Sequence, residues 1–134
     1  MNLPQMDADK RKSELNGITE KIIGCVYDVS NSLGCGFLEK VYENALAHEL
    51  WKVGFTVNQQ HAITVRYDGI IVGDFIADLL VEGSVLVELK TAKALDDAYM
   101  AQCINYLKAT GLHICLLINF GKPKVEIKRI VLDL

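Results

Sequence analysis

The sequence predicts an α/β fold, α+β by some conventions, in which a mixed central sheet is flanked by helices. Apolar residues recur at helical intervals in the N-terminal third, and Asp68-Gly69 is a strong hairpin signal between two β-rich runs. An acidic pair, Asp96-Asp97, is typical of a helix start and is followed by two further strand-like runs. With 134 residues, 51% of them apolar, the chain fits one domain with a substantial core.

Two helices are predicted first. Residues 1–13 are polar and read as a flexible lead-in, so that the single domain covers residues 14–134. The first helix runs from about residue 14 to Gly34, where glycine readily takes the left-handed conformation of a helix end. The second helix begins near Leu38 and ends near Gly54.

The remaining elements are strands and one more helix. Residues 55–67, 70–81 and 84–90 are predicted to form an antiparallel meander of three strands. A third helix covers about residues 98–109, and two strands follow near 113–119 and 125–131. The predicted element order is therefore α-α-β-β-β-α-β-β.

Charge and cysteine content limit the classes of function. A net charge of −3 argues against a protein whose main task is to coat nucleic acid, because such proteins carry a basic excess. The four cysteines show no metal-binding spacing, which favours reduced, structural thiols. The sequence shows neither a secretory signal nor an apolar run long enough for a bilayer. We therefore expect a cytoplasmic protein without a membrane partner.

Charged residues interrupt two neighbouring apolar runs, and their register decides whether they meet. A two-residue loop after the first run would place Asp78 on the opposite face from Glu88. A three-residue loop over residues 81–83, with Gly83 left-handed at its third position, pairs Asp78 with Leu86. Glu88 then lies diagonally from Asp78 on the same face. We predict this second register because the glycine stands where that loop requires it.

Carboxylates in this arrangement suit a hard divalent cation such as Mg²⁺, which prefers oxygen ligands and keeps waters for a phosphate substrate. Lys90 shares a face with Glu88 and would orient the attacking water or stabilise charge on the phosphate. The alternative is structural: Asp78 and Glu88 are strand-end charges, and Lys90 pairs with Glu88.

These residues also carry a resemblance to known proteins. Asp78 followed after a hairpin by Glu88-Leu89-Lys90 resembles the D…E-x-K signature of the PD-(D/E)XK nuclease superfamily, although Ala77 stands where that superfamily often has proline. Gly36-x-x-Glu39-x-x-Tyr42 is similar to the motif of the small bacterial and archaeal GxxExxY protein family. Further similar stretches are Val87–Lys90, Gln102 with Asn105–Leu107, and Ile118–Gly121, so that the likeness spans about residues 15–132.

The resemblance implies a restriction-endonuclease-like core and a metal-dependent nuclease that uses Mg²⁺ or Mn²⁺. It adds Glu39 as a third metal ligand beside Asp78 and Glu88, the alternative being a favourable charge at a helix N-terminus. It adds Gln102 as an auxiliary catalytic residue beside Lys90, the alternative being an ordinary helix-face residue. The implied partner is nucleic acid, DNA before RNA, and the protein is expected to pair as a homodimer. The competing function is a non-catalytic accessory module that binds nucleic acid or a protein.

Overall fold

The structure of the chain is a computed structural model that describes residues 3–134. It contains three helices and five strands in the order that the sequence predicts. The elements are α1 (Leu3–Leu33), α2 (Glu39–Lys52), β1 (Val57–Tyr67), β2 (Ile70–Val81), β3 (Val85–Lys90), α3 (Asp97–Thr110), β4 (Ile114–Asn119) and β5 (Glu126–Val131).

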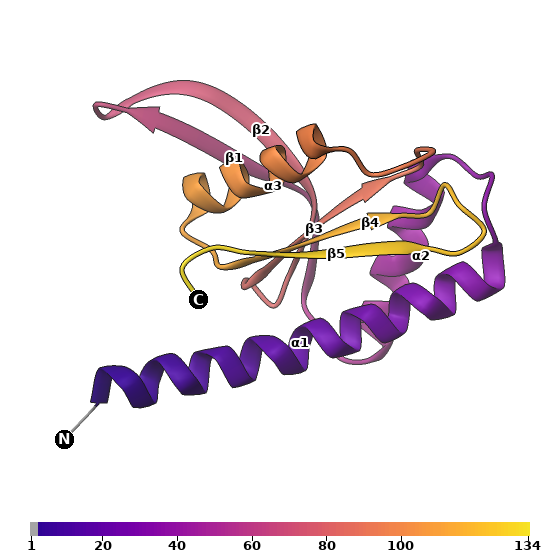
Figure 1. Cartoon of the computed structure of the whole chain (residues 1–134), viewed down its shortest axis with the longest axis horizontal. Helices are drawn as coiled ribbons and strands as arrows, with labels where there is room; N and C mark the ends of the chain where they lie inside the picture. Colours follow the sequence, from indigo (N-terminus) through magenta and orange to yellow (C-terminus); the bar gives the residue numbers. More distant parts are fainter. Residues whose placement is uncertain (1–2) are drawn as a thin grey trace.

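The five strands form one mixed sheet in the order β1-β2-β3-β4-β5 (Figure 1). Neighbouring strands are antiparallel except β3 and β4, which are parallel and are joined through α3. Helices α1 and α2 pack on one face, where Val85, Val87 and Leu89 of β3 are fully buried as predicted. Helix α3 covers the other face and packs on a second apolar cluster that includes Leu86 and Leu117. The α+β fold class is therefore confirmed.

Helix α1 starts earlier than the sequence predicts. Residues 1–2 of the predicted lead-in lie outside the described residues, but residues 3–13 are helical instead of irregular. From residue 7 onward, Leu15 is the first side chain of α1 in the core, and the residues before it in the sequence show no apolar stripe that would indicate a helix. Their Lys, Arg, Ala and Glu residues favour helix by intrinsic propensity alone.

Within residues 3–134, no helix has the length and apolar character needed to span a bilayer.

The β1–β2 hairpin extends beyond the rest of the sheet and runs beside α3 (Figure 1). Its turn is the predicted one, with positive φ at both Asp68 and Gly69, as a type I′ turn requires. The register slips by one residue after Val65, which adds a local bend to the hairpin.

The register between β2 and β3 differs from the predicted one. Leu79 pairs with Val87 and Leu80 with Leu86, so Asp78 stands opposite Glu88 and not opposite Leu86. The loop residues are 82–84, because both Glu82 and Gly83 have positive φ and the Ser84 amide donates to the Val81 carbonyl. The prediction of a three-residue loop with both carboxylates on one face is correct, but the loop lies one residue later.

A tertiary contact explains this shift. Glu82 donates its backbone N–H to the Thr56 carbonyl, and its carboxylate accepts a hydrogen bond from the Thr56 amide. These reciprocal bonds hold Glu82 in a left-handed conformation that a glutamate rarely adopts alone. Thr56 lies before β1, so the residues of the loop do not by themselves predict which position the loop takes.

Candidate active site between strands β2 and β3

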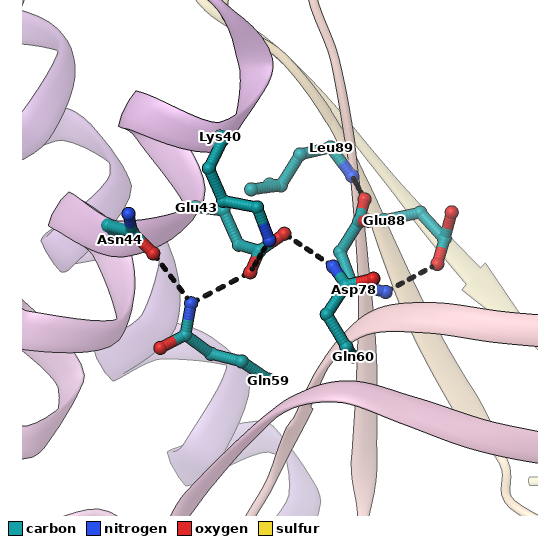
Figure 2. A network of polar contacts seen from close by, with 8 residues as sticks. All are labelled: Lys40, Glu43, Asn44, Gln59, Gln60, Asp78, Glu88 and Leu89. Carbon is teal, nitrogen blue, oxygen red and sulfur yellow. Dashed lines mark hydrogen bonds and ion pairs between the residues drawn. The ribbon is translucent and has the colours of Figure 1, made fainter.

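The side chains of Asp78 and Glu88 exchange hydrogen bonds with the backbone of each other's strand (Figure 2). The Asp78 amide donates to Glu88 Oε1 at 2.9 Å, and the Leu89 amide donates to Asp78 Oδ2 at 2.8 Å. These side-chain acceptors replace the sheet ladder, whose pairing ends at Leu79 and Val87. The two carboxylates are therefore fixed at the point where the two strands separate.

Strand β1 is interrupted at the same level. Gln59 pairs with Leu79 and His61 with Ala77, but Gln60 between them has a φ of 55° and does not join the ladder opposite Asp78. Asp78 thus lies at a break in the pairing on both of its sides. A polar side chain in the middle of a sheet becomes accessible at such a break.

Lys90 ends β3 beside these carboxylates. Its Nζ lies 4.8 Å from the centre of the Tyr99 ring, a cation–π contact with α3, and its side chain is half-buried. Among residues 3–134 no ion pair joins Lys90 to Glu88. The structural alternative, in which Lys90 simply neutralises Glu88, is therefore not what the structure shows.

The backbone that follows Lys90 is held by the end of β4. The buried Asn119 side chain accepts a hydrogen bond from the Ala92 amide and donates one to the Ala92 carbonyl, both at 2.9 Å. Asn119 Oδ1 also accepts from the Gly121 amide, and the Phe120 amide donates to the Lys90 carbonyl. This clamp fixes the position at which Lys90 leaves the sheet.

The Gly36-x-x-Glu39-x-x-Tyr42 motif forms the turn that starts α2. The buried Tyr42 hydroxyl donates to the Gly34 carbonyl at 2.6 Å and accepts from the Phe37 amide at 3.2 Å. Tyr42 is therefore a core aromatic whose hydroxyl links Gly34 and Phe37 of this turn. By holding this turn, it sets the position of Glu39 in the first residue of the helix.

The sequence reasoning missed a buried carboxylate, Glu43, one turn further along α2. It accepts hydrogen bonds from Gln59 and Gln60 of β1, each at 2.7 Å, and from Lys40 at 2.9 Å (Figure 2). Gln59 also donates to Asn44. This network ties α2 to the break in β1 next to Asp78. The available signal in the sequence was spacing. Glu43 stands at helical intervals from the buried apolar residues of α2, so it falls on their face of the helix despite its charge.

We expect Glu43→Ala to lower the free energy of unfolding by about 2 kcal/mol, since it removes a buried acceptor of three charge-assisted hydrogen bonds. Glu49→Ala is the matched control, because Glu49 forms the same i,i+3 ion pair with Lys52 on an exposed part of α2. A surface pair of that kind contributes less than about 1 kcal/mol. Urea unfolding of both variants measures the difference, and equal losses would contradict the assigned role of Glu43.

The site concentrates negative charge. Burial, followed by the charge of Asp78, raises the pKa of Glu88 to about 8, against the opposing effects of the Asp78 amide and the Lys90 ammonium. Burial also raises the pKa of Asp78, although the Leu89 N–H acts against this, and the charge of Glu43 adds to it. The pKa of Glu39 is raised by burial and then by the charge of Asp78. Beyond burial, the charge of a neighbouring carboxylate therefore raises the pKa of each of these three groups.

The donor atoms suit a hard cation held by two protein ligands. The hydrogen bonds use Asp78 Oδ2 and Glu88 Oε1, and the other oxygen of each carboxylate accepts none from residues 3–134. Two carboxylates with water in the remaining positions are a common arrangement for Mg²⁺. Glu39 does not complete a set of three: within the described chain, no three His, Cys, Asp or Glu residues are placed to hold one ion.

Gln102 lies on the face of α3 that is turned toward the sheet. Its amide donates to the Tyr106 hydroxyl at 3.0 Å, a contact within its own helix. Tyr106 is buried, and its pKa is raised by burial and then by the charges of Glu88 and Asp78. Gln102 is therefore held by Tyr106, and within residues 3–134 no hydrogen bond joins it to Asp78 or Glu88.

The carboxylate pair thus lies where two strands of a mixed sheet separate, and Lys90 follows it on β3. Residues 16–130 match the sequence profile of the PD-(D/E)XK nuclease superfamily. The chain belongs to the PD-(D/E)XK nuclease superfamily.

Two solved structures show the same fold. An alkaline exonuclease, LHK-Exo, from Laribacter hongkongensis superposes with a TM-score of 0.53 at 18% identity over 70% of this chain. The crystal structure titled SSO0001 superposes with a TM-score of 0.56, also at 18% identity, over 93% of this chain. The chain spans only 56% and 63% of those two proteins, respectively. A comparison with curated proteins gives no match.

Proposed function

We propose that this protein is a metal-dependent nuclease that hydrolyses phosphodiester bonds of nucleic acid, with DNA as the favoured substrate. The observation that carries the proposal is the pair of crossed hydrogen bonds that fixes Asp78 and Glu88 beside Lys90. Membership of the superfamily and the fold shared with an exonuclease support it. The Gly36-x-x-Glu39-x-x-Tyr42 turn supports a place in the GxxExxY group.

In this proposal Asp78 and Glu88 bind Mg²⁺ or Mn²⁺ through the oxygens that the backbone amides do not use. A divalent ion at such a site neutralises charge on the phosphate and makes bound water more acidic. Lys90, held against the Tyr99 ring, orients the attacking water and stabilises charge on the phosphate. Glu39 assists through water at the edge of the site, and Gln102 is an auxiliary contact positioned by Tyr106.

The test is cleavage of end-labelled DNA and RNA, single-stranded and duplex, with Mg²⁺ or Mn²⁺ and with EDTA. Asp78→Asn keeps an acceptor for the Leu89 amide but removes the charge, and Lys90→Ala removes the ammonium. Each is expected to lower the cleavage rate by at least about 100-fold. EDTA is expected to abolish cleavage by the wild type.

Two neighbouring residues supply matched controls. The exposed Asp74 lies on the same strand as Asp78, and the exposed Lys93 follows Lys90, so Asp74→Asn and Lys93→Ala should cleave like the wild type. Calorimetric titration with Mg²⁺ gives a second readout, expected to show binding that Asp78→Asn and Glu88→Gln both lose. If the wild type shows no cleavage and no metal binding, the proposal is contradicted and the non-catalytic accessory module is favoured.

Three wider expectations belong to the same proposal. Residues 14–134 act as a single domain. All four cysteines are free, including the buried neighbours Cys103 and Cys115, which fits a reducing cytoplasm. A homodimer is supported by large apolar side chains exposed along the β1–β2 hairpin, among them Tyr67, Ile70 and Val72, and sedimentation measures it.

A further inference from the structure

A groove of about 880 Å³ lies between the β1–β2 hairpin and α3. Val65 and Phe75 of the hairpin form one wall, and Ala98 and Ala101 of α3 form the other. Figure 1 shows the hairpin running past α3 beyond the rest of the sheet. Phe75 is 46% exposed, and its ring is available to a ligand in the groove.

The groove and the candidate active site share helix α3. Gln102 and Tyr106 line it, and the Phe75 ring contacts the Tyr106 ring with the two centroids 5.9 Å apart. Tyr99 follows Ala98 of the groove on α3, and its ring contacts Lys90 Nζ at 4.8 Å. A strand bound in the groove therefore lies against the helix that also contacts Lys90.

The charge of the groove is opposite to that of the whole chain. The protein has a net charge of −3, yet Arg66 and Lys108 line the groove, and within residues 3–134 no acidic residue does. The groove also presents the amide side chains of Gln102 and Asn105, which both donate and accept hydrogen bonds. Cations, amides and an exposed aromatic ring together match phosphates, base edges and base faces.

We propose that this groove binds an unpaired nucleic-acid strand, so that the substrate of the proposed nuclease is single-stranded or carries a single-stranded end. That the bound strand is a substrate rests on the proposed function, whereas binding of the strand does not. Phe75 stacks on a base, which a duplex does not offer because its base faces are already stacked. The volume lies within the roughly 300–1,000 Å³ of ligand sites, which suits a short run of nucleotides and not a whole duplex.

Fluorescence anisotropy in EDTA tests binding without cleavage. The probes are a labelled oligothymidine of about 15 nucleotides, similar to the site size of other single-strand binders, and a duplex of equal length. Wild type is expected to bind the single strand at least about tenfold more tightly than the duplex. Phe75→Ala is expected to weaken binding of the strand about tenfold through lost stacking. The double variant Arg66→Gln/Lys108→Gln should weaken it and reduce its dependence on salt.

Matched controls come from the opposite side and edge of the fold. Tyr27 on α1 is exposed to the same 46% as Phe75, and Lys124 and Lys128 near β5 are exposed like the two cations of the groove. Tyr27→Ala and Lys124→Gln/Lys128→Gln should bind like the wild type. Circular dichroism confirms that each variant is folded, and the double charge variant tests the groove without opening the core.

Three results would overturn the proposal: equal affinity for strand and duplex, no binding of either probe, or unchanged binding of the strand by both groove variants. The outcome is separate from that of the proposed function. If the protein cleaves nucleic acid and the groove variants bind the strand like the wild type, the proposed strand site is rejected and the proposed nuclease activity stands. If strand binding depends on the groove but no cleavage occurs, the nuclease activity is rejected and the strand site stands.

Discussion

Glu88→Gln is expected to make the metal-free protein more stable than the wild type at about pH 9, by up to about 5 kcal/mol. The wild-type carboxyl has its pKa raised from 4.5 to about 8 in the folded protein, mainly by burial. The folded protein therefore keeps a proton that the unfolded chain releases between these values. Its contribution to stability is complete below pH 4.5 and is lost as the pH rises to about 8.

Glutamine at position 88 removes the loss of stability with rising pH but keeps the hydrogen bond from the Asp78 amide. Its carbonyl oxygen can still accept the hydrogen bond from the Asp78 amide, so the variant changes charge more than geometry. Denaturation in EDTA at about pH 5 and about pH 9 is the measurement, with the exposed Asp74→Asn as control. We expect the stability of Glu88→Gln to depend less on pH than that of the wild type. A wild type whose stability does not fall between these pH values would disprove the assignment.

Gly121→Ala is expected to lower the free energy of unfolding by at least about 3 kcal/mol. A Cβ at this position would lie 2.5 Å from the Ala92 carbonyl oxygen and 2.6 Å from the Ala92 nitrogen. Both are backbone atoms, and Asn119 holds that segment from the other side. The segment therefore cannot move without breaking the clamp behind Lys90.

Gly24→Ala is the matched control for this substitution. Gly24 lies within α1, and a Cβ there has no atom within 4 Å. Alanine should stabilise the helix by about 0.5–1 kcal/mol. Thermal unfolding of both variants gives opposite shifts if the close approach at Ala92 is real. A Gly121→Ala variant as stable as the wild type would show that the segment is free to move.

Local chemistry was enough to predict most of the fold. The β2 boundaries, the Asp68-Gly69 turn and the α3 cap at Asp96, whose side chain accepts from the Tyr99 amide, all agree with the sequence. Each depends on residues within a few positions of one another, such as a turn that needs positive φ. The start of α1 was missed because the sequence of its first turns shows no apolar periodicity.

The candidate site could be predicted in its residue types but not in its geometry. Alternation along β3 placed Glu88 and Lys90 on one face, and a three-residue loop brought Asp78 to that face. The direct opposition of Asp78 and Glu88 and their crossed hydrogen bonds depend on Glu82 being held by Thr56, a residue far away in the sequence. Local turn rules favoured the neighbouring position for the loop.

The sequence by itself therefore determined the element order, the superfamily signature and the face of the sheet that carries the charges, because period and turn chemistry are local properties. Only the tertiary structure decided the strand register, the burial of Glu43 against Gln59 and Gln60, and the clamp of Asn119 on Ala92. Each of these joins segments that are distant along the chain. Their partners become neighbours only when the sheet has formed and the helices have packed on it.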